Sequence, residues 1–148
     1  MYQNGYTNQY DNQQYQTVLR LIRQLMGWES YGELMIDYLI GQTRDSDSEE
    51  TLYVLRQDER NHYDTLAWMY TELSGQRANV QTPTEHVPEG YIDGLGIILK
   101  RKTKMMKLYV HLYIYSPQQY QGVLYPFLSE EQTHMHMINY LLIRKSLL

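Results

Sequence analysis

Hydrophobic residues recur at intervals of three and four positions along most of the chain, which is the period of an amphipathic α-helix. Four long segments carry this pattern, at about residues 17–41, 48–74, 89–115 and 118–146. None of them shows the alternation of apolar and polar residues that is typical of a β-strand. Helices of roughly 25 residues are nearly 40 Å long at about 1.5 Å per residue. The pattern therefore predicts an all-α fold, a bundle of four antiparallel helices.

The connections between the segments indicate how the helices are joined. The polar stretch TRDSDSEET at 43–51 contains Ser and Asp residues that can cap the second helix, and the SP pair at 116–117 ends the third. Short connections of this kind join neighbouring helices into hairpins. The middle connection, at 75–90, holds two of the four prolines and is long enough to cross the bundle at about 3.3 Å per residue. We expect two helical hairpins joined by one long crossover.

Residues 1–16 differ from the rest of the chain. Their sequence, MYQNGYTNQYDNQQYQ, consists largely of Asn, Gln and Tyr and offers almost nothing to bury in a core. We interpret this stretch as a mobile tail of biased composition. The bundle is then expected to occupy residues 17–148.

Two copies of one short motif lie within the hydrophobic seams of the second and fourth segments. DERNH at 58–62 and EEQTH at 130–134 each contain an acidic residue, then Glu, two further residues and His. In both seams the Glu and the His take consecutive core positions between apolar residues: Leu52, Leu55, Glu59, His62, Leu66, Met69 and Leu73, and then Leu124, Phe127, Glu131, His134, Ile138 and Leu141. The copies are 72 residues apart, and this common offset indicates a duplicated hairpin.

A carboxylate and an imidazole in a leucine-rich seam are costly to bury unless something compensates them. Residues three positions apart project to the same side of a helix, so the Glu and the His of one motif can converge on one metal ion. Two such helices facing each other would surround a pair of ions. The alternative is that both histidines are ordinary core residues whose Glu neighbours are incidental.

The first segment offers two further carboxylates, Glu29 and Glu33, one helical turn apart. Glu29 continues the seam of core positions in this segment, so we expect it to be a bridging or terminal metal ligand. Glu33 lies on the adjacent edge of the helix. It is either another ligand from this helix or a solvated residue on the flank of the bundle.

Composition restricts the chemistry further. The chain has no cysteine, which excludes thiol catalysis, iron–sulfur clusters and cysteine-based zinc sites. Any metal must then be held by carboxylate and imidazole groups, which suit iron, manganese and zinc. The net charge is −4, so we expect no general attraction to nucleic acid or to an anionic membrane. No apolar run is long enough to span a bilayer and no signal peptide is recognisable, so a cytoplasmic protein is expected.

With these motifs the chain resembles the ferritin-like di-iron carboxylate superfamily, and in particular its rubrerythrin-like branch. The resemblance covers about residues 17–146. The superfamily takes one Glu from each of helices one and three and an E-x-x-H motif from each of helices two and four, and the two motifs of this chain match that pattern. WES at 28–30 is similar to the Gly-Glu-Ser that supplies the helix-one ligand in rubrerythrins, which favours Glu29 as the ligand.

The resemblance implies two iron ions, with manganese as the alternative metal. It also implies oxygen or peroxide chemistry of the ferroxidase or peroxidase type, with no catalytic residue beyond the metal ligands. The glutamates of the motifs would bridge the ions or bind them terminally, and each histidine would bind one ion. Rubrerythrins also carry a cysteine-ligated iron domain that delivers electrons. This chain, which has no cysteine, would need an external electron donor.

The third segment departs from the superfamily pattern. Its seam contains no Glu and reads Tyr91, Gly94, Ile98, Arg101, Met105, Leu108 and Leu112. Where the superfamily has a bridging carboxylate, this chain has Arg101 followed by Lys102. Two divalent ions and a buried cation facing only three carboxylates would leave a net charge of about +2 in the core, which is severely unfavourable.

Three outcomes are open at this position. Arg101 and Lys102 can both point outward while Glu33 completes the site. A single metal ion can bind in place of two. A cation from the third helix can also replace metal altogether, by bridging the carboxylates as a buried ion-pair cluster.

Four polar residues outside the ligand set are expected at the surface. His111 and His136 have no seam position that would bury them, and we interpret both as surface or interface residues. Asp58 and Glu130 immediately precede the motif glutamates. We favour solvent exposure for these two acids over the alternative, in which they orient a histidine by hydrogen bonding.

A structural function is the main rival hypothesis. The chain has 16 tyrosines and one phenylalanine. Its N-terminus and residues 109–126 resemble the composition of tyrosine-rich coat proteins of bacterial spores. Outside the tail, we expect most tyrosines to be packing or surface residues with polar tips. A metal-poor, spore-associated coat protein is thus the alternative, and with either function we expect a homodimer or another homo-oligomer.

Overall fold

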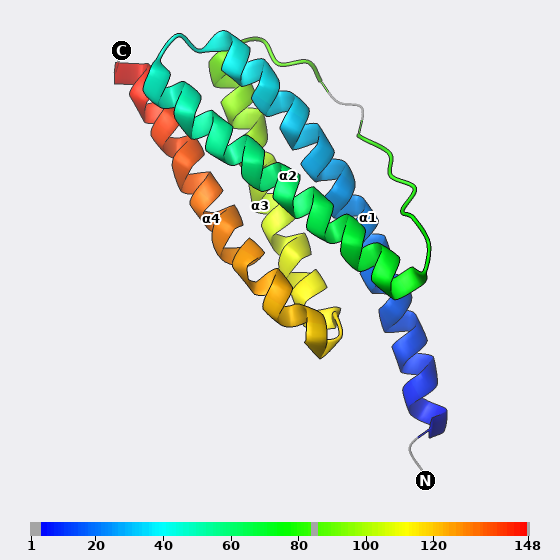
Figure 1. Ribbon diagram of the computed structural model, residues 1–148. Helices are drawn as coiled ribbons and strands as arrows, with labels where there is room; N and C mark the ends of the chain where they lie inside the picture. Colours follow the sequence, from blue (N-terminus) through cyan, green and yellow to red (C-terminus); the bar gives the residue numbers. More distant parts are fainter. Residues whose placement is uncertain (1–3, 84–85, 148) are drawn as a thin grey trace.

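The computed structural model describes the backbone of residues 4–83 and 86–147, and the side chains from residue 12 onward within those ranges. The described residues form four α-helices and no β-strand: α1 (Asn4–Gln42), α2 (Ser46–Ser74), α3 (Tyr91–Tyr115) and α4 (Gln118–Leu147) (Figure 1). This confirms the prediction of an all-α, four-helix fold.

Helices α2, α3 and α4 begin and end within a few residues of the predicted boundaries, but α1 does not. It begins at Asn4 rather than near Thr17, and its first turns project beyond the end of the bundle (Figure 1). The prediction that the first helix starts at residue 17 was therefore wrong. Hydrophobic periodicity marks where a helix enters a core, whereas the helix itself can start earlier in a polar sequence.

Short capped turns join α1 to α2 and α3 to α4. Asp45 caps α2, because its side chain accepts hydrogen bonds from the backbone N–H of Ser48 at 3.3 Å and from the Ser48 hydroxyl at 2.6 Å. Arg144 at the end of α4 forms an ion pair with the same carboxylate. The helix end that carries the C-terminus is thereby fastened to the α1–α2 turn.

The long connection between α2 and α3 runs beside α1 from one end of the bundle to the other (Figure 1). It starts at Gly75, whose φ of 70° is the left-handed conformation that favours glycine at a helix end. A Cβ at Gly27 of α1 would lie 2.7 Å from the Gln81 carbonyl oxygen, so glycine is needed where the connection crosses this helix. The Ser30 and Thr82 hydroxyls add a hydrogen bond of 3.1 Å between the two segments.

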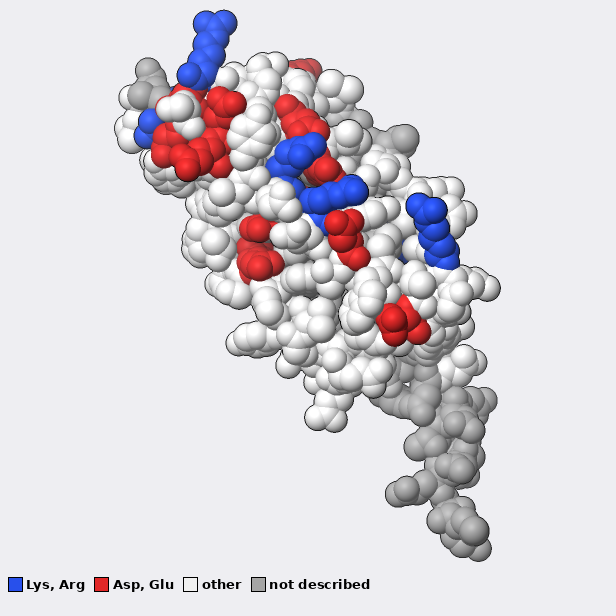
Figure 2. Space-filling model, viewed as in Figure 1, with Lys and Arg blue, Asp and Glu red and all other residues white. Residues whose placement is uncertain are grey.

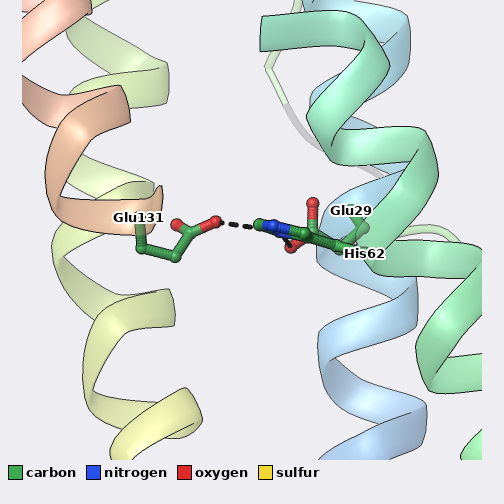
Figure 3. Close-up of side chains that lie close together, drawn as sticks. All are labelled: Glu29, His62 and Glu131. Carbon is green, nitrogen blue, oxygen red and sulfur yellow. Dashed lines mark hydrogen bonds and ion pairs between the residues drawn. The ribbon is translucent and has the colours of Figure 1, made fainter. Parts of the chain in front are cut away.

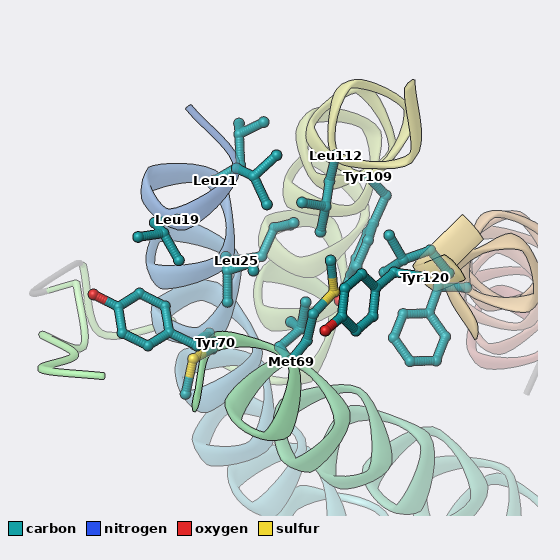
Figure 4. Packing of buried hydrophobic residues seen from close by; sticks show 14 of the residues in the cluster. Leu19, Leu21, Leu25, Met69, Tyr70, Tyr109, Leu112 and Tyr120 are labelled. Carbon is teal, nitrogen blue, oxygen red and sulfur yellow. The ribbon is translucent and has the colours of Figure 1, made fainter. Parts of the chain in front are cut away.

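The buried hydrophobic residues form two clusters, one toward each end of the bundle. Figure 4 shows the first, in which Leu25, Met69 and Leu112 from three helices meet Tyr120 of α4. The second cluster lies around the halves of the helices nearer the α1–α2 turn and consists of Tyr31, Met35, Ile36, Leu39, Leu52, Leu55, Leu95, Ile98, Ile138 and Leu141. Between the two clusters, the seams of all four helices carry charged residues.

No helix in the described part of the chain is both long and apolar enough to cross a membrane. On the face of the molecule seen in Figure 2, acidic and basic side chains lie next to one another. Neighbouring opposite charges of this kind contribute little to stability, because water and salt screen them.

Candidate metal centre

A layer of ionisable side chains lies between the two hydrophobic clusters and receives residues from all four helices. Each of them is at most 2% exposed: Glu29 from α1, Glu59 and His62 from α2, Lys102 from α3, and Glu131 and His134 from α4. The prediction that the side chains of both motifs and of Glu29 meet inside the bundle is therefore confirmed for their positions.

Two groups of three side chains in this layer have the geometry to hold a metal ion. The first group is Glu29, His62 and Glu131, and the second is Glu59, Glu131 and His134. Within each group the candidate ligand atoms lie within 4.8 Å of one another. Glu131 belongs to both groups, so its carboxylate is the element that connects them.

His62 lies between Glu29 and Glu131 (Figure 3). Its Nδ1 atom is 3.2 Å from Glu29 Oε1 and 3.4 Å from Glu131 Oε1. The first group therefore brings carboxylates from α1 and α4 to the same nitrogen of an α2 histidine. Two carboxylates and one imidazole form a ligand set that suits divalent iron or manganese.

Lys102 enters the layer from α3. Its ammonium group donates hydrogen bonds to Glu59 Oε1 and, at 3.0 Å, to Glu131 Oε1. Burial lowers the pKa of Lys102, but the carboxylates of Glu131, Glu59 and Glu29 outweigh this effect and raise the pKa above its usual value. Lys102 is therefore a fixed positive charge within the second group.

Arg101, the other candidate cation of α3, packs against α1. Its guanidinium group lies 4.0 Å from the ring centroids of both Trp28 and Tyr31, so it is packed between two aromatic residues of α1. Arg101 is buried, as its seam position predicts, and the adjacent Lys102 is buried as well and bonds the carboxylates. Further along the seam the prediction was wrong, because Tyr109 is completely buried and Leu108 is only partly buried.

Asp58 and Glu130, the acids that precede the motif glutamates, accept hydrogen bonds from the two histidines. The favoured prediction, that these acids are only solvent-exposed, was therefore wrong. His62 Nε2 donates to Glu130 Oε2 at 2.5 Å, and His134 Nε2 donates to Asp58 Oδ2 at 2.8 Å. Each acid thus binds the histidine of the other motif. A proton held on Nε2 leaves the lone pair of Nδ1 available, which is the form a metal-binding histidine needs.

Burial and neighbouring charges shift the pKa values of the carboxyl groups in opposite directions. Burial raises the pKa of Glu59, and the nearby charge of Glu29 raises it further, so Glu59 ends well above its usual range. Burial also raises the pKa values of Glu29 and Glu131, but Lys102 and the hydrogen bonds around them reverse this effect. These two groups are therefore carboxylates, whereas Glu59 binds a proton readily.

His62 is the second cation of the metal-free layer. Burial lowers its pKa, but hydrogen bonds with Glu131 and Glu29 outweigh burial and raise it to about 11. With His62 and Lys102 positive, Glu29 and Glu131 negative and Glu59 neutral, these five groups together carry no net charge in the metal-free protein. A metal ion that binds here must therefore displace protons.

Two residues of the site were not found by sequence reasoning. The Tyr109 hydroxyl donates to Glu29 Oε1 at 2.5 Å, and burial raises the pKa of this phenol well above its usual value. Gly32 makes room for Glu59, because a Cβ at this position would lie 2.8 Å from Glu59 Oε2. Tyr109 lies seven residues after Lys102 and therefore on the same face of α3. Its position in the site could have been predicted only if this face had been known to point inward.

Glu33 belongs to neither group of candidate ligands, so of its two predicted roles the structure favours the flank residue over the metal ligand. It is paired at the surface with Arg56 and Arg60 of α2, in both cases with an N–O distance of 3.7 Å. His111 and His136 are both exposed, as predicted.

Several buried ligand atoms accept no hydrogen bond from the described residues: Glu29 Oε2, Glu59 Oε2, Glu131 Oε2 and His134 Nδ1. Buried acceptors without partners cost free energy, and a cation would satisfy them. The residues of the first group therefore fit a divalent metal ion. Comparisons with protein-family models, with curated proteins and with solved structures gave no match.

Proposed function

We propose that the protein is a ferritin-like metal-binding protein that holds iron, or manganese as the alternative, in the buried layer of Glu and His residues. The observation that carries this proposal is the convergence of both E-x-x-H motifs and Glu29 on common centres, with acceptor atoms that have no partner among the described residues. Oxygen or peroxide chemistry of the ferroxidase or peroxidase type is the corresponding activity.

The arrangement of the helices supports the ferritin-like part of the proposal. Helices α1 and α2 form one hairpin, α3 and α4 form the other, and a single long connection crosses the bundle between them (Figure 1). Antiparallel pairs joined in this way are the connectivity of ferritin-like bundles. The motif helices α2 and α4 face each other across the charged layer, as that fold requires for a shared centre.

The residues around the site each have a definite part in such a function. A bound metal ion would supply reversible one-electron oxidation and reduction. Glu130 and Asp58 hold the protons on the outer nitrogens of the histidines, and Tyr109 fixes the orientation of Glu29. Because the chain has no cysteine, the electrons come from an external donor.

A metal-free structural protein is the alternative function, and one observation favours it. Lys102 already bonds Glu59 and Glu131, so both of these side chains have a cationic partner without metal. Several tyrosines are also exposed on the helices, among them Tyr53 and Tyr125. Exposed phenols of this kind suit the tyrosine-rich, spore-coat-like alternative.

Metal analysis after anaerobic loading with Fe(II) separates the two functions. The wild-type protein is expected to retain iron through gel filtration, whereas Glu131→Gln, which removes the ligand common to both groups, is expected to retain none. Glu33→Gln is the matched control, because it neutralises a surface carboxylate outside the site and is expected to leave the iron content unchanged. A wild-type protein that retains neither iron nor manganese would establish the metal-free alternative.

A further inference from the structure

The centre that the superfamily resemblance implies, a pair of metal ions, does not fit this structure. A second ion would need the group Glu59, Glu131 and His134. Two of these three ligands are already bonded to the ammonium group of Lys102, which is 2% exposed and is held between α2 and α4. Lys102 therefore occupies the place that a second metal ion would need.

The charges of the layer lead to the same result. The buried carboxylates are those of Glu29, Glu59 and Glu131. One divalent ion together with the ammonium group of Lys102 balances these three negative charges with both histidines neutral. Two divalent ions plus Lys102 would leave an excess of about two positive charges in a core of low polarity, at a cost of several kcal/mol per uncompensated ion.

In the first group only one of the three ligands is bonded to Lys102. Glu29 and His62 make no hydrogen bond with Lys102 that the structure shows, and only Glu131 is shared between the ammonium group and the first group. Glu29 Oε2 and Glu131 Oε2, both fully buried, have no hydrogen-bond partner among the described residues. The layer therefore keeps one intact set of metal ligands next to one built-in cation.

We propose that Lys102 permanently replaces the second metal ion, and that the protein binds a single divalent transition-metal ion through Glu29, His62 and Glu131. This inference rests on the proposed metal-binding function and specifies its stoichiometry and location. The centre is then one ion and one ammonium group bridged by the Glu131 carboxylate. His134, the counterpart of His62 in the second motif, is not a ligand.

The test compares metal stoichiometry and affinity in four proteins: wild type, His62→Gln, His134→Gln and Lys102→Glu. Isothermal titration with Mn(II) gives the number of ions per chain, and electron paramagnetic resonance distinguishes an isolated Mn(II) ion from a coupled pair. The wild type is expected to bind one ion with the spectrum of an isolated centre. His62→Gln is expected to lose more than about tenfold in affinity, whereas the matched variant His134→Gln stays close to wild type.

Lys102→Glu adds a fourth carboxylate to the layer. This variant is expected to bind two Mn(II) ions and to show the electron paramagnetic resonance spectrum of a coupled pair. If this variant does not fold, the wild-type stoichiometry and the two histidine variants still decide the question. Two ions in the wild type, or loss of the ion in His134→Gln, would overturn the single-ion inference and leave the proposed function standing. A wild-type protein that binds no Mn(II) or Fe(II) at all would instead overturn the proposed function.

Discussion

His62 of α2 donates a hydrogen bond of 2.5 Å from Nε2 to Glu130, which lies next to the ligand glutamate of the other motif. His134 makes the equivalent bond to Asp58, so the two motifs orient each other's histidines across the α2–α4 interface. The acid at the start of each motif therefore acts on the opposite helix, where it orients the histidine of the other motif. This reciprocity also provides a pair of matched residues for experiments.

Removing Glu130 should weaken metal binding more than removing Asp58. Under the single-ion proposal only His62 binds metal, so only its partner Glu130 maintains a ligand in the required tautomer. Loss of such a partner typically lowers metal affinity by roughly 10- to 100-fold. Glu130→Ala is thus expected to show this loss in a Mn(II) titration, while Asp58→Ala binds nearly as wild type. Equal losses in both variants would mean that both histidines bind metal.

The helices and the burial of the motifs could be predicted from the sequence, because both depend on local periodicity. The Glu and the His of each motif take seam positions, and a seam position is buried in nearly any bundle. The roles of Asp58 and Glu130 could not be predicted in the same way. Their hydrogen bonds cross between α2 and α4, and their geometry depends on the relative rotation of two helices that are distant in sequence.

The choice between Arg101 and Lys102 also depended on a helix rotation. Both residues are cationic and adjacent, and a seam with intervals of three and four tolerates either of them at the inward position. In the structure Arg101 packs on α1, where its guanidinium group lies 4.0 Å from the ring centroids of Trp28 and Tyr31. Two aromatic residues three positions apart are a signal that becomes meaningful only once α1 and α3 are known to be neighbours.

Lys102→Met should strongly destabilise the metal-free protein. It leaves Glu131 and Glu59 buried without the ammonium group that bonds both of them. Removing one partner of a buried ion pair costs about 3–5 kcal/mol, and we expect the lower end because Glu59 can bind a proton. Urea unfolding in the presence of a chelator measures the difference. Lys100→Met, an exposed position on the same helix, is the control and is expected to change stability by less than about 0.5 kcal/mol.

Equal unfolding free energies for the Lys102→Met and Lys100→Met variants would show that the ammonium group contributes no net stability. The carboxylates would then be compensated in some other way, for example by protonation of both. Adding Mn(II) to the Lys102→Met variant provides a further check, since a divalent ion can take over the neutralisation of Glu131. Metal is expected to raise the melting temperature of this variant by binding only the folded state.

The ion pair between Asp45 and Arg144 should make stability depend on pH in the acid range. The hydrogen bond from Arg144, followed by that from Ser48, lowers the pKa of Asp45 below its usual value of 3.8. The folded state therefore binds fewer protons than the unfolded state. The stabilisation is complete above about pH 4 and is lost as the pH falls through the folded-state pKa.

Asp45→Asn isolates this charge effect, because Asn caps a helix about as well as Asp. Thermal unfolding is expected to show a melting temperature for Asp45→Asn below that of the wild type at neutral pH, with the difference shrinking as the pH falls below about 4. Asp64→Asn, at an exposed position of α2, is the comparison variant and is expected to show a smaller difference. If the difference in melting temperature between Asp45→Asn and the wild type does not change with pH, the effect comes from capping geometry rather than from charge.

Gly32→Ala should destabilise the protein, although alanine is normally the better residue within a helix. The added methyl group would lie 2.8 Å from Glu59 Oε2 and force this carboxyl group away from Lys102. Gly96→Ala in α3 is the matched control, since no described atom lies within 4 Å of the position of its Cβ. That variant is expected to gain up to about 1 kcal/mol from helix propensity. Chemical unfolding of both should give changes of opposite sign, and a gain in Gly32→Ala equal to that in Gly96→Ala would mean that Glu59 moves aside without loss.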